Sequence, residues 1–195
     1  MKSKIRILHA AAGAQAIDIY VDGKLQFSNF NFAKVTPYTN ITPGKHEFKI
    51  FEAGKTSNPL FINTYEIIPN EIVTLSIVFL ENNLTIFTLK DNPTNNSVNI
   101  SFVRFINLCP NSPLFTLSLP DGNALFKGVE YLETTGFYPL SPGLYNFIVT
   151  ATNDSFFKKY ISNIQLNENS DHTIFILGLV NEKPELGFLI TDDNI

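Results

Sequence analysis

The sequence contains one structural unit twice. The stretch TPGKHEFKI at residues 42–50 has a close counterpart in SPGLYNFIV at residues 141–149. The segment AIDIYVDGK at residues 16–24 is matched in the same way by LFTLSLPDGN at residues 114–123. Such internal self-similarity is the signature of a repeated fold, and half of this 195-residue chain is long enough to bury a core of its own. We therefore expect two copies of one small domain in tandem.

Both copies alternate between apolar and polar residues with a period of two. In residues 45–50 this alternation places His46, Phe48 and Ile50 on one face, because successive side chains of a strand point to opposite sides. Residues 144–149 keep the same pattern in the second copy. We find no convincing helical period in either copy. The secondary structure is therefore expected to consist of strands.

Turn signals divide each copy into roughly seven or eight short strands. Asp22-Gly23 is a strong hairpin signal, and Thr-Pro-Gly and Ser-Pro-Gly mark a tight turn at equivalent places. Short strands with such regular turns favour a two-sheet sandwich, with a small barrel as the alternative. We predict an all-β protein of two tandem immunoglobulin-like antiparallel β-sandwich domains, with the first at residues 1–92, a linker at 93–100 and the second at 101–195.

The repeated segments also carry a family resemblance. The short strand that ends at His9-Ala10, the AIDIYVDGK segment, the VTPYTNITPGKHEFKI segment and the tandem repeat together resemble the DUF4397 family of bacterial domains. The resemblance covers residues 4–92 and, more weakly, residues 101–194, where Asn107-Leu108 replaces His9-Ala10. It implies immunoglobulin-type sandwiches, often in tandem, in proteins that are mostly exported or surface-associated. It brings no established catalytic residues.

Charge and hydropathy argue against several classes of function. The formal net charge is −4, so the chain lacks the basic surface that holds nucleic acid. No segment approaches the roughly 20 apolar residues that a membrane-spanning helix needs, and we expect no membrane insertion. The N-terminal residues carry no secretory signal as written. We expect a cytoplasmic origin, with the spore or cell surface as the destination.

The residues that could carry chemistry are few and scattered. His9, His46 and His172 lie far apart in the sequence, and none belongs to a metal-binding motif. His9 has the strongest functional claim, but Asn107 takes its place in the second copy, which indicates a shared hydrogen-bonding role at the strand end. The single Cys109 allows no intramolecular disulfide and is expected to be a small apolar filler. We predict no enzyme activity, no catalytic residue, no metal and no cofactor.

Several large apolar side chains have no evident place in the core. Tyr20 should point outward, and Phe27, Phe30, Phe32 and Tyr38 lie in and around the loop that follows. The alternative is that Phe30 and Phe32 close the end of the sandwich. Phe175 and Leu177 make both faces of their strand apolar, so we expect its outer face to be covered by the first domain or by another chain. The candidate interaction surface consists of Tyr20, Phe30, Phe32, Tyr38, Phe175 and Leu177.

These observations favour one function and leave two alternatives. The leading hypothesis is a non-catalytic structural or adhesive building block of a bacterial cell envelope or spore outer layer, acting through self-association or a protein partner. The first alternative is a carbohydrate-binding module in which exposed Tyr and Phe side chains stack on a glycan. The second is a hydrolase whose triad is assembled only by folding, with a Ser, Cys or Thr in hydrogen-bond reach of one histidine.

Overall fold

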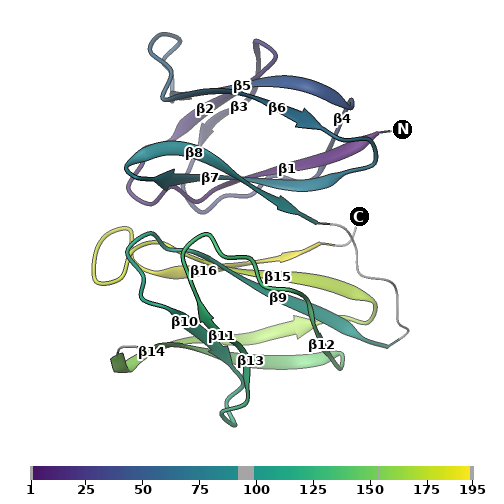
Figure 1. The fold of residues 1–195 in the computed structure, drawn as a ribbon, viewed down its shortest axis with the longest axis vertical. Coiled ribbons are helices and arrows are strands. Elements are labelled where there is room, and N and C mark those ends of the chain that lie inside the picture. The colour runs from purple at the N-terminus through teal and green to yellow at the C-terminus, as the bar shows by residue number, and fades with distance from the viewer. Residues whose placement is uncertain (1, 92–98, 153, 194–195) are drawn as a thin grey trace. The chain divides into compact units, whose positions relative to one another are not determined.

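The chain divides into two compact units, Met1–Asn92 and Pro93–Ile195. A computed structural model describes residues 2–91, 99–152 and 154–193. Most of the predicted linker, residues 93–98, therefore lies outside the described residues. In each unit two four-stranded sheets lie face to face (Figure 1).

The first domain contains eight strands. One sheet has the order β4-β1-β7-β8 and the other the order β3-β2-β5-β6. The strands are β1 (Ser3–His9), β2 (Ile17–Val21), β3 (Lys24–Phe30), β4 (Thr39–Ile41), β5 (Gly44–Glu52), β6 (Phe61–Ile67), β7 (Ile72–Leu80) and β8 (Asn83–Lys90).

The second domain repeats this arrangement strand for strand. Its sheets have the orders β12-β9-β15-β16 and β11-β10-β13-β14. Every strand thus occupies the place of its counterpart in the first domain. The strands are β9 (Ser101–Leu108), β10 (Phe115–Ser118), β11 (Ala124–Val129), β12 (Tyr138–Leu140), β13 (Gly143–Ala151), β14 (Asp154–Leu166), β15 (Ser170–Leu177) and β16 (Gly187–Asp192).

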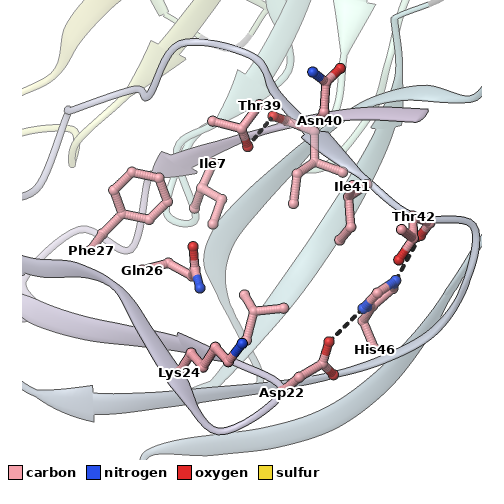
Figure 2. A pocket seen from close by; sticks show the side chains of 12 residues that line it. Ile7, Asp22, Lys24, Gln26, Phe27, Thr39, Asn40, Ile41, Thr42 and His46 are labelled. Atoms are coloured by element: carbon pink, nitrogen blue, oxygen red, sulfur yellow. Dashed lines mark hydrogen bonds and ion pairs between the residues drawn. The ribbon is translucent and has the colours of Figure 1, made fainter. Parts of the chain in front are cut away.

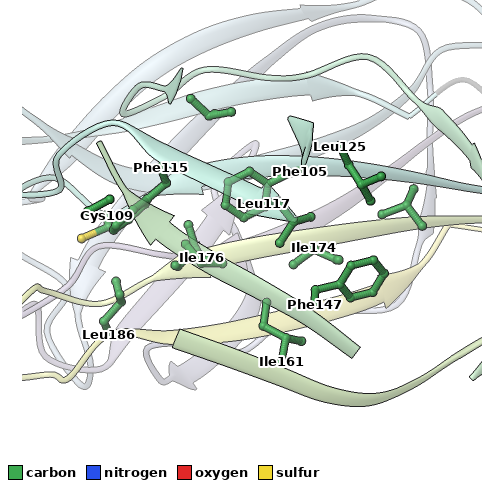
Figure 3. Close-up of a cluster of buried hydrophobic side chains, with 14 of the residues drawn as sticks. Phe105, Cys109, Phe115, Leu117, Leu125, Phe147, Ile161, Ile174, Ile176 and Leu186 are labelled. Carbon is green, nitrogen blue, oxygen red and sulfur yellow. The ribbon is translucent and has the colours of Figure 1, made fainter. Parts of the chain in front are cut away.

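Each sandwich has its own apolar core, built from the residues that alternate inward. In the first domain Ile17, Ile19 and Phe48 are buried in the cluster between the sheets. In the second, Phe105 and Phe147 both belong to the buried cluster between the sheets, which also contains Cys109 (Figure 3). The predicted all-β sandwich is confirmed.

The part of the chain that the structure describes contains no helix long and apolar enough to cross a membrane.

The strand directions differ in one respect from the antiparallel prediction. β1 runs parallel to β7, and β9 runs parallel to β15, whereas the other strand pairs are antiparallel. Alternation reports which face a residue occupies but carries no information on strand direction, which is why the sequence did not reveal these pairs. The immunoglobulin-like topology is not confirmed, because in that fold the first and second strands share a sheet, whereas here β1 and β2 lie in different sheets.

The two turn signals behave as their chemistry requires. Asp22 and Gly23 have φ angles of 50° and 75° and connect β2 to β3 in a tight hairpin, as a turn with two left-handed residues needs. Gly44 and Gly143 have φ angles of 127° and 156° at the point where the chain passes from one sheet to the other. Glycine is favoured there because residues with a Cβ rarely adopt such φ values.

Candidate functional site

The first domain has a cleft of about 320 Å³ at the side of the sandwich that edge strands β3 and β4 form (Figure 2). Its floor is apolar and includes Ile5, Ile7 and Phe27. Its rim is polar and includes Asp22, Gln26 and His46. The core of the sandwich is therefore accessible from this side, between hydrogen-bonding groups.

His46 joins the two turns at the rim of this cleft. Its Nδ1 lies 2.7 Å from Oδ2 of Asp22, and its Nε2 lies 2.7 Å from the carbonyl oxygen of Thr42 (Figure 2). The other carboxylate oxygen of Asp22 accepts a hydrogen bond from the amide of Glu47 at 2.9 Å. Both ring nitrogens face oxygen acceptors, so only the imidazolium, which donates from both nitrogens, satisfies the two contacts at once.

The charges of this pair reinforce each other. Burial opposes protonation of His46, but the hydrogen bonds to Asp22 and Thr42 and the Asp22 charge outweigh it and raise the His46 pKa. The hydrogen bond from His46 lowers the Asp22 pKa, and the amide of Glu47 adds to this effect. In the second domain Tyr145 takes the place of His46, and its hydroxyl donates to the carbonyl oxygen of Ser141 at 2.9 Å. An imidazole, which titrates near neutral pH, therefore makes this contact in the first domain, and a tyrosine hydroxyl, which does not, makes it in the second. We call the contacts of His46 with Asp22 and Thr42 the His46 lock.

A second polar cluster lies on the other sheet of the first domain. The Nε of Arg6 donates to Oγ1 of Thr74 at 2.6 Å, and this hydroxyl donates to Asp91. The hydroxyl of Tyr38 donates to the same carboxylate at 2.9 Å, and the Arg6 guanidinium lies 4.6 Å from the Tyr38 ring centre. Arg6 and Asp91 are 3% and 1% exposed. We call these four residues the Arg6 cluster.

The second domain contains the equivalent Arg104 cluster. Arg104 donates to Thr173 at 2.7 Å and lies 3.4 Å from Asp193, which also accepts from Thr191 at 2.8 Å. The guanidinium lies over the ring of Phe137 at 4.9 Å from its centre. A buried arginine, threonine and aspartate are therefore present at the same positions of both copies. The sequence shows Arg6 and Arg104 at equivalent places, but the partners become visible only when the fold brings the ends of the domain together.

The comparison with protein families gives two overlapping matches to one family. The family model described as "Domain of unknown function (DUF4397)" matches residues 3–118 and 101–195. The chain belongs to the DUF4397 family. A search of curated proteins finds no match. Among solved structures, the Bacillus anthracis TIE protein matches 96% of this chain at 16% sequence identity and a TM-score of 0.28, and the chain spans 34% of the length of that protein.

The other histidines of this DUF4397 protein are held inside the domains. His9 is fully buried between the rings of Phe30 and Phe32, and burial lowers its pKa. Its Nε2 lies 3.3 Å from the carbonyl oxygen of Gln15, while its counterpart Asn107 donates to Ser112 at 2.8 Å. Both side chains thus bond to the loop after their strand, as the hydrogen-bonding interpretation of His9 proposed.

His172 does have a serine partner. Its Nε2 lies 2.8 Å from Oγ of Ser170, two residues earlier on β15. The same hydroxyl lies 2.5 Å from the carbonyl oxygen of Asn167 and 3.0 Å from Oγ of Ser101. Ser170 and His172 are both buried, and neither lines any of the three cavities described for this protein. A nucleophile that a substrate cannot reach does not support the hydrolase alternative. Burial likewise raises the pKa of the Cys109 thiol to about 11, which keeps it protonated.

The residues of the candidate interaction surface occupy different environments. Tyr20 lies on the outer face of its sheet with its ring edge-on to Phe51, whereas Tyr38 belongs to the Arg6 cluster. Phe30 and Phe32 are half-buried against His9. Phe175 and Leu177 are buried, on the face of β15 opposite Ile174 and Ile176, which belong to the core. The first-domain aromatic residues therefore form no continuous row.

The most exposed apolar residues of the second domain were not predicted from the sequence. Phe156 and Tyr160 are 93% and 61% exposed on edge strand β14, and Leu144 on the neighbouring strand β13 is 65% exposed. All three point away from the core, because their neighbours Phe157, Ile161 and Tyr145 pack against it. The run SFFKKY conceals this pattern, because apolar residues stand on both sides of the alternation. We call Leu144, Phe156 and Tyr160 the β14 patch.

The His46 lock makes the first domain sensitive to pH. Because the folded state raises the His46 pKa, the added stability is fully present below about pH 6.5 and is lost as pH rises through the raised pKa. We expect the free energy of unfolding of the first domain to fall by about 0.5–1.5 kcal/mol, the value of one hydrogen bond, once the imidazole is neutral. Urea unfolding across this pH range measures the change.

The matched control copies the second domain. His46→Tyr should keep the bond to the Thr42 carbonyl, as Tyr145 bonds to Ser141, and should remove the pH dependence in this range. A wild-type domain whose stability is constant, or rises, across the same range contradicts the interpretation.

Proposed function

We propose that this DUF4397 protein is a non-catalytic structural or adhesive building block of a bacterial cell envelope or spore outer layer, and that it acts by binding further copies of itself. The observation that carries the proposal is the β14 patch. Leu144, Phe156 and Tyr160 are large apolar side chains exposed on the outer side of the β13–β14 pair, and apolar side chains gathered on one face of a protein mark contact surfaces more often than scattered ones do. The proposed surface location is supported by the resemblance to a family whose members are mostly exported or surface-associated.

The partner we propose for the patch is a second copy of the chain. Lys158 stands between Phe156 and Tyr160 on the same strand and is exposed with them. The chain carries 18 acidic and 14 basic side chains, so another copy offers an excess of carboxylates for this lysine around an apolar contact. Pairing along the backbone edge of β14 is less favoured, because two register shifts interrupt its pairing with β13, and bulges of this kind protect edges.

The arrangement of the His, Cys, Asp and Glu side chains supports a role without catalysis. Within the described ranges no three His, Cys, Asp or Glu side chains lie close enough to hold a metal ion. Each histidine is also engaged inside its domain, at Gln15 for His9, at Asp22 for His46 and at Ser170 for His172. These hydrogen bonds give each histidine a role in stabilising its own domain.

The test compares the assembly state of the wild type with that of a Phe156→Ser/Tyr160→Ser double variant. We expect the double variant to weaken self-association by at least about tenfold, which corresponds to about 1.4 kcal/mol. Sedimentation velocity over a range of protein concentrations measures the dissociation constant. The two serines face solvent, so the unfolding midpoint should stay that of the wild type.

Ile62→Ser is the matched control, because Ile62 is 53% exposed on β6, the counterpart of β14 in the first domain. It should leave the dissociation constant unchanged. A wild type that stays monomeric at every concentration overturns the proposal, as does a double variant that associates like the wild type.

A further inference from the structure

We propose that the cleft between β3 and β4 in the first domain binds one sugar residue of a glycan. The proposal is independent of self-association, because it rests on another domain and on other residues. It also differs from a module built on exposed aromatic rows, since the first-domain aromatics form no such row. Three observations carry it. The residues at the cleft differ in size between the two copies, the cleft has an apolar floor and a polar rim, and the polar groups of the rim are held in place or exposed.

The cleft walls differ between the two copies of the domain. Thr39 and Tyr138 occupy equivalent places, opposite Ile5 and Val103 on the neighbouring strands. The Tyr138 ring lies edge-on to Phe126 at 6.2 Å between centres. Phe105 likewise takes the place of the smaller Ile7. Large side chains thus occupy the positions in the second domain that leave space in the first.

The walls of the cleft match a ligand with one apolar face and polar edges. The floor presents the half-buried Phe27, on which the C–H face of a pyranose ring can pack, together with the almost fully buried Ile5 and Ile7. The rim presents the carboxylate of Asp22 and the amide of Gln26, which bond to hydroxyl groups as acceptor and as donor. A volume of about 320 Å³ lies at the small end of the range for ligand pockets and suits a single ring.

The polar groups at the rim are positioned for a ligand. The two bonds of the Asp22 carboxylate to His46 and to the Glu47 amide fix its orientation, while its side chain stays 51% exposed. The side chains of Gln26 and Lys24 line the cleft and are exposed, and the Lys24 charge acts on the Asp22 carboxylate. A carboxylate held in place beside exposed donors is an arrangement that a hydroxyl-rich ligand can satisfy without a conformational change.

Other ligand classes fit the cleft less well. A purely apolar ligand would remove Asp22 and Lys24 from water without giving them a partner. A phosphate or other strong anion would find Lys24 as a partner, but both ring nitrogens of His46 are already engaged with Asp22 and Thr42, and the Asp22 carboxylate would repel the anion. An extended peptide would need a regular edge, but β3 has two register shifts in its pairing with β2, and Pro37 and Pro43 flank the three-residue β4.

The experiment titrates the full chain with D-glucose, D-galactose and N-acetyl-D-glucosamine as probes. Amide resonances in nitrogen–proton NMR spectra report binding residue by residue. We expect at least one sugar to shift the resonances of Gln26, Thr39 and Ile41, with a dissociation constant on the order of 1 mM. The equivalent resonances of the second domain should not move.

Two substitutions decide whether the cleft is the site. Thr39→Tyr copies Tyr138 and should fill the cleft, weakening binding at least about tenfold. Thr64→Tyr, the control, adds the same ring to the exposed outer face of β6 and should leave binding unchanged. The dispersion of the spectra shows that both variants are folded. The proposal fails if none of the three sugars shifts the cleft resonances, or if the shifts persist in the Thr39→Tyr variant.

Discussion

Replacing Asp91 by alanine is expected to destabilise the first domain by about 3–5 kcal/mol, the cost of leaving a buried charge without its partner. Asp91 is the acceptor at the centre of the Arg6 cluster and takes hydrogen bonds from Thr74 and Tyr38 as well. Its removal takes away a carboxylate 3.8 Å from the Arg6 guanidinium, which is 3% exposed, and the acceptor of two hydroxyl groups. Equilibrium unfolding in urea measures the loss.

A paired substitution separates charge from packing. Arg6→Met/Asp91→Leu removes both charges and keeps apolar volume, so it should recover most of the stability lost in Asp91→Ala. Asp121→Ala, at an exposed turn of the second domain, is the control and should change stability by less than about 0.5 kcal/mol. If Asp91→Ala costs no more than this control, the Arg6 cluster does not hold the domain together.

Replacing Phe147 by alanine is expected to destabilise the second domain by about 3–5 kcal/mol. Phe147 is fully buried in the core cluster (Figure 3). Its ring is stacked on that of Tyr145 at 5.9 Å between centres. The truncation removes buried apolar surface and leaves a cavity that close-packed neighbours fill only in part. Calorimetry should show a lower transition temperature for the second domain.

The same experiment tests whether the two copies unfold separately. Phe48 is the counterpart of Phe147 in the first domain and is also fully buried. Phe48→Ala should lower the transition of the first domain and Phe147→Ala that of the second. Phe156→Ala, which truncates a 93% exposed ring, is the control and should move neither transition. One common transition that shifts equally in both core variants would show that the domains unfold as a single unit.

The sequence was most informative where alternation and turn chemistry act locally. Ile17 and Ile19 alternate with polar neighbours and lie in the core, and Asp22-Gly23 forms the hairpin that its residues demand. The repeat allowed each assignment of an inward-facing residue to be checked in the second copy. Phe48 and Phe147, for example, occupy equivalent positions, and both were expected to be buried. Such features depend on neighbours in the chain, which a sequence displays directly.

Features that depend on contacts between distant segments could not be predicted in the same way. Asp91 and Asp193 look like residues of turns or tails until the parallel pairing of β1 with β7, and of β9 with β15, brings them to Arg6 and Arg104. The cleft also escapes sequence analysis, because it arises from strands of two different sheets. For His46, the partner Asp22 lies 24 residues earlier in the chain, so this pairing required the fold.

The parallel pairing of β1 with β7 also governs how each domain is completed during synthesis. Lys4 pairs with Ile72, so the first strand leaves the ribosome long before its neighbour exists. The second domain has the same delay, because Ser101 pairs with Ser170. Contacts between residues so distant in sequence form slowly. Until they form, β1 and β9 lack their parallel neighbour and can pair with other strands. Because the two copies are similar in sequence, β15 is an alternative pairing partner for β1 in place of β7. If the first domain folds before β15 is synthesised, this mispairing is avoided.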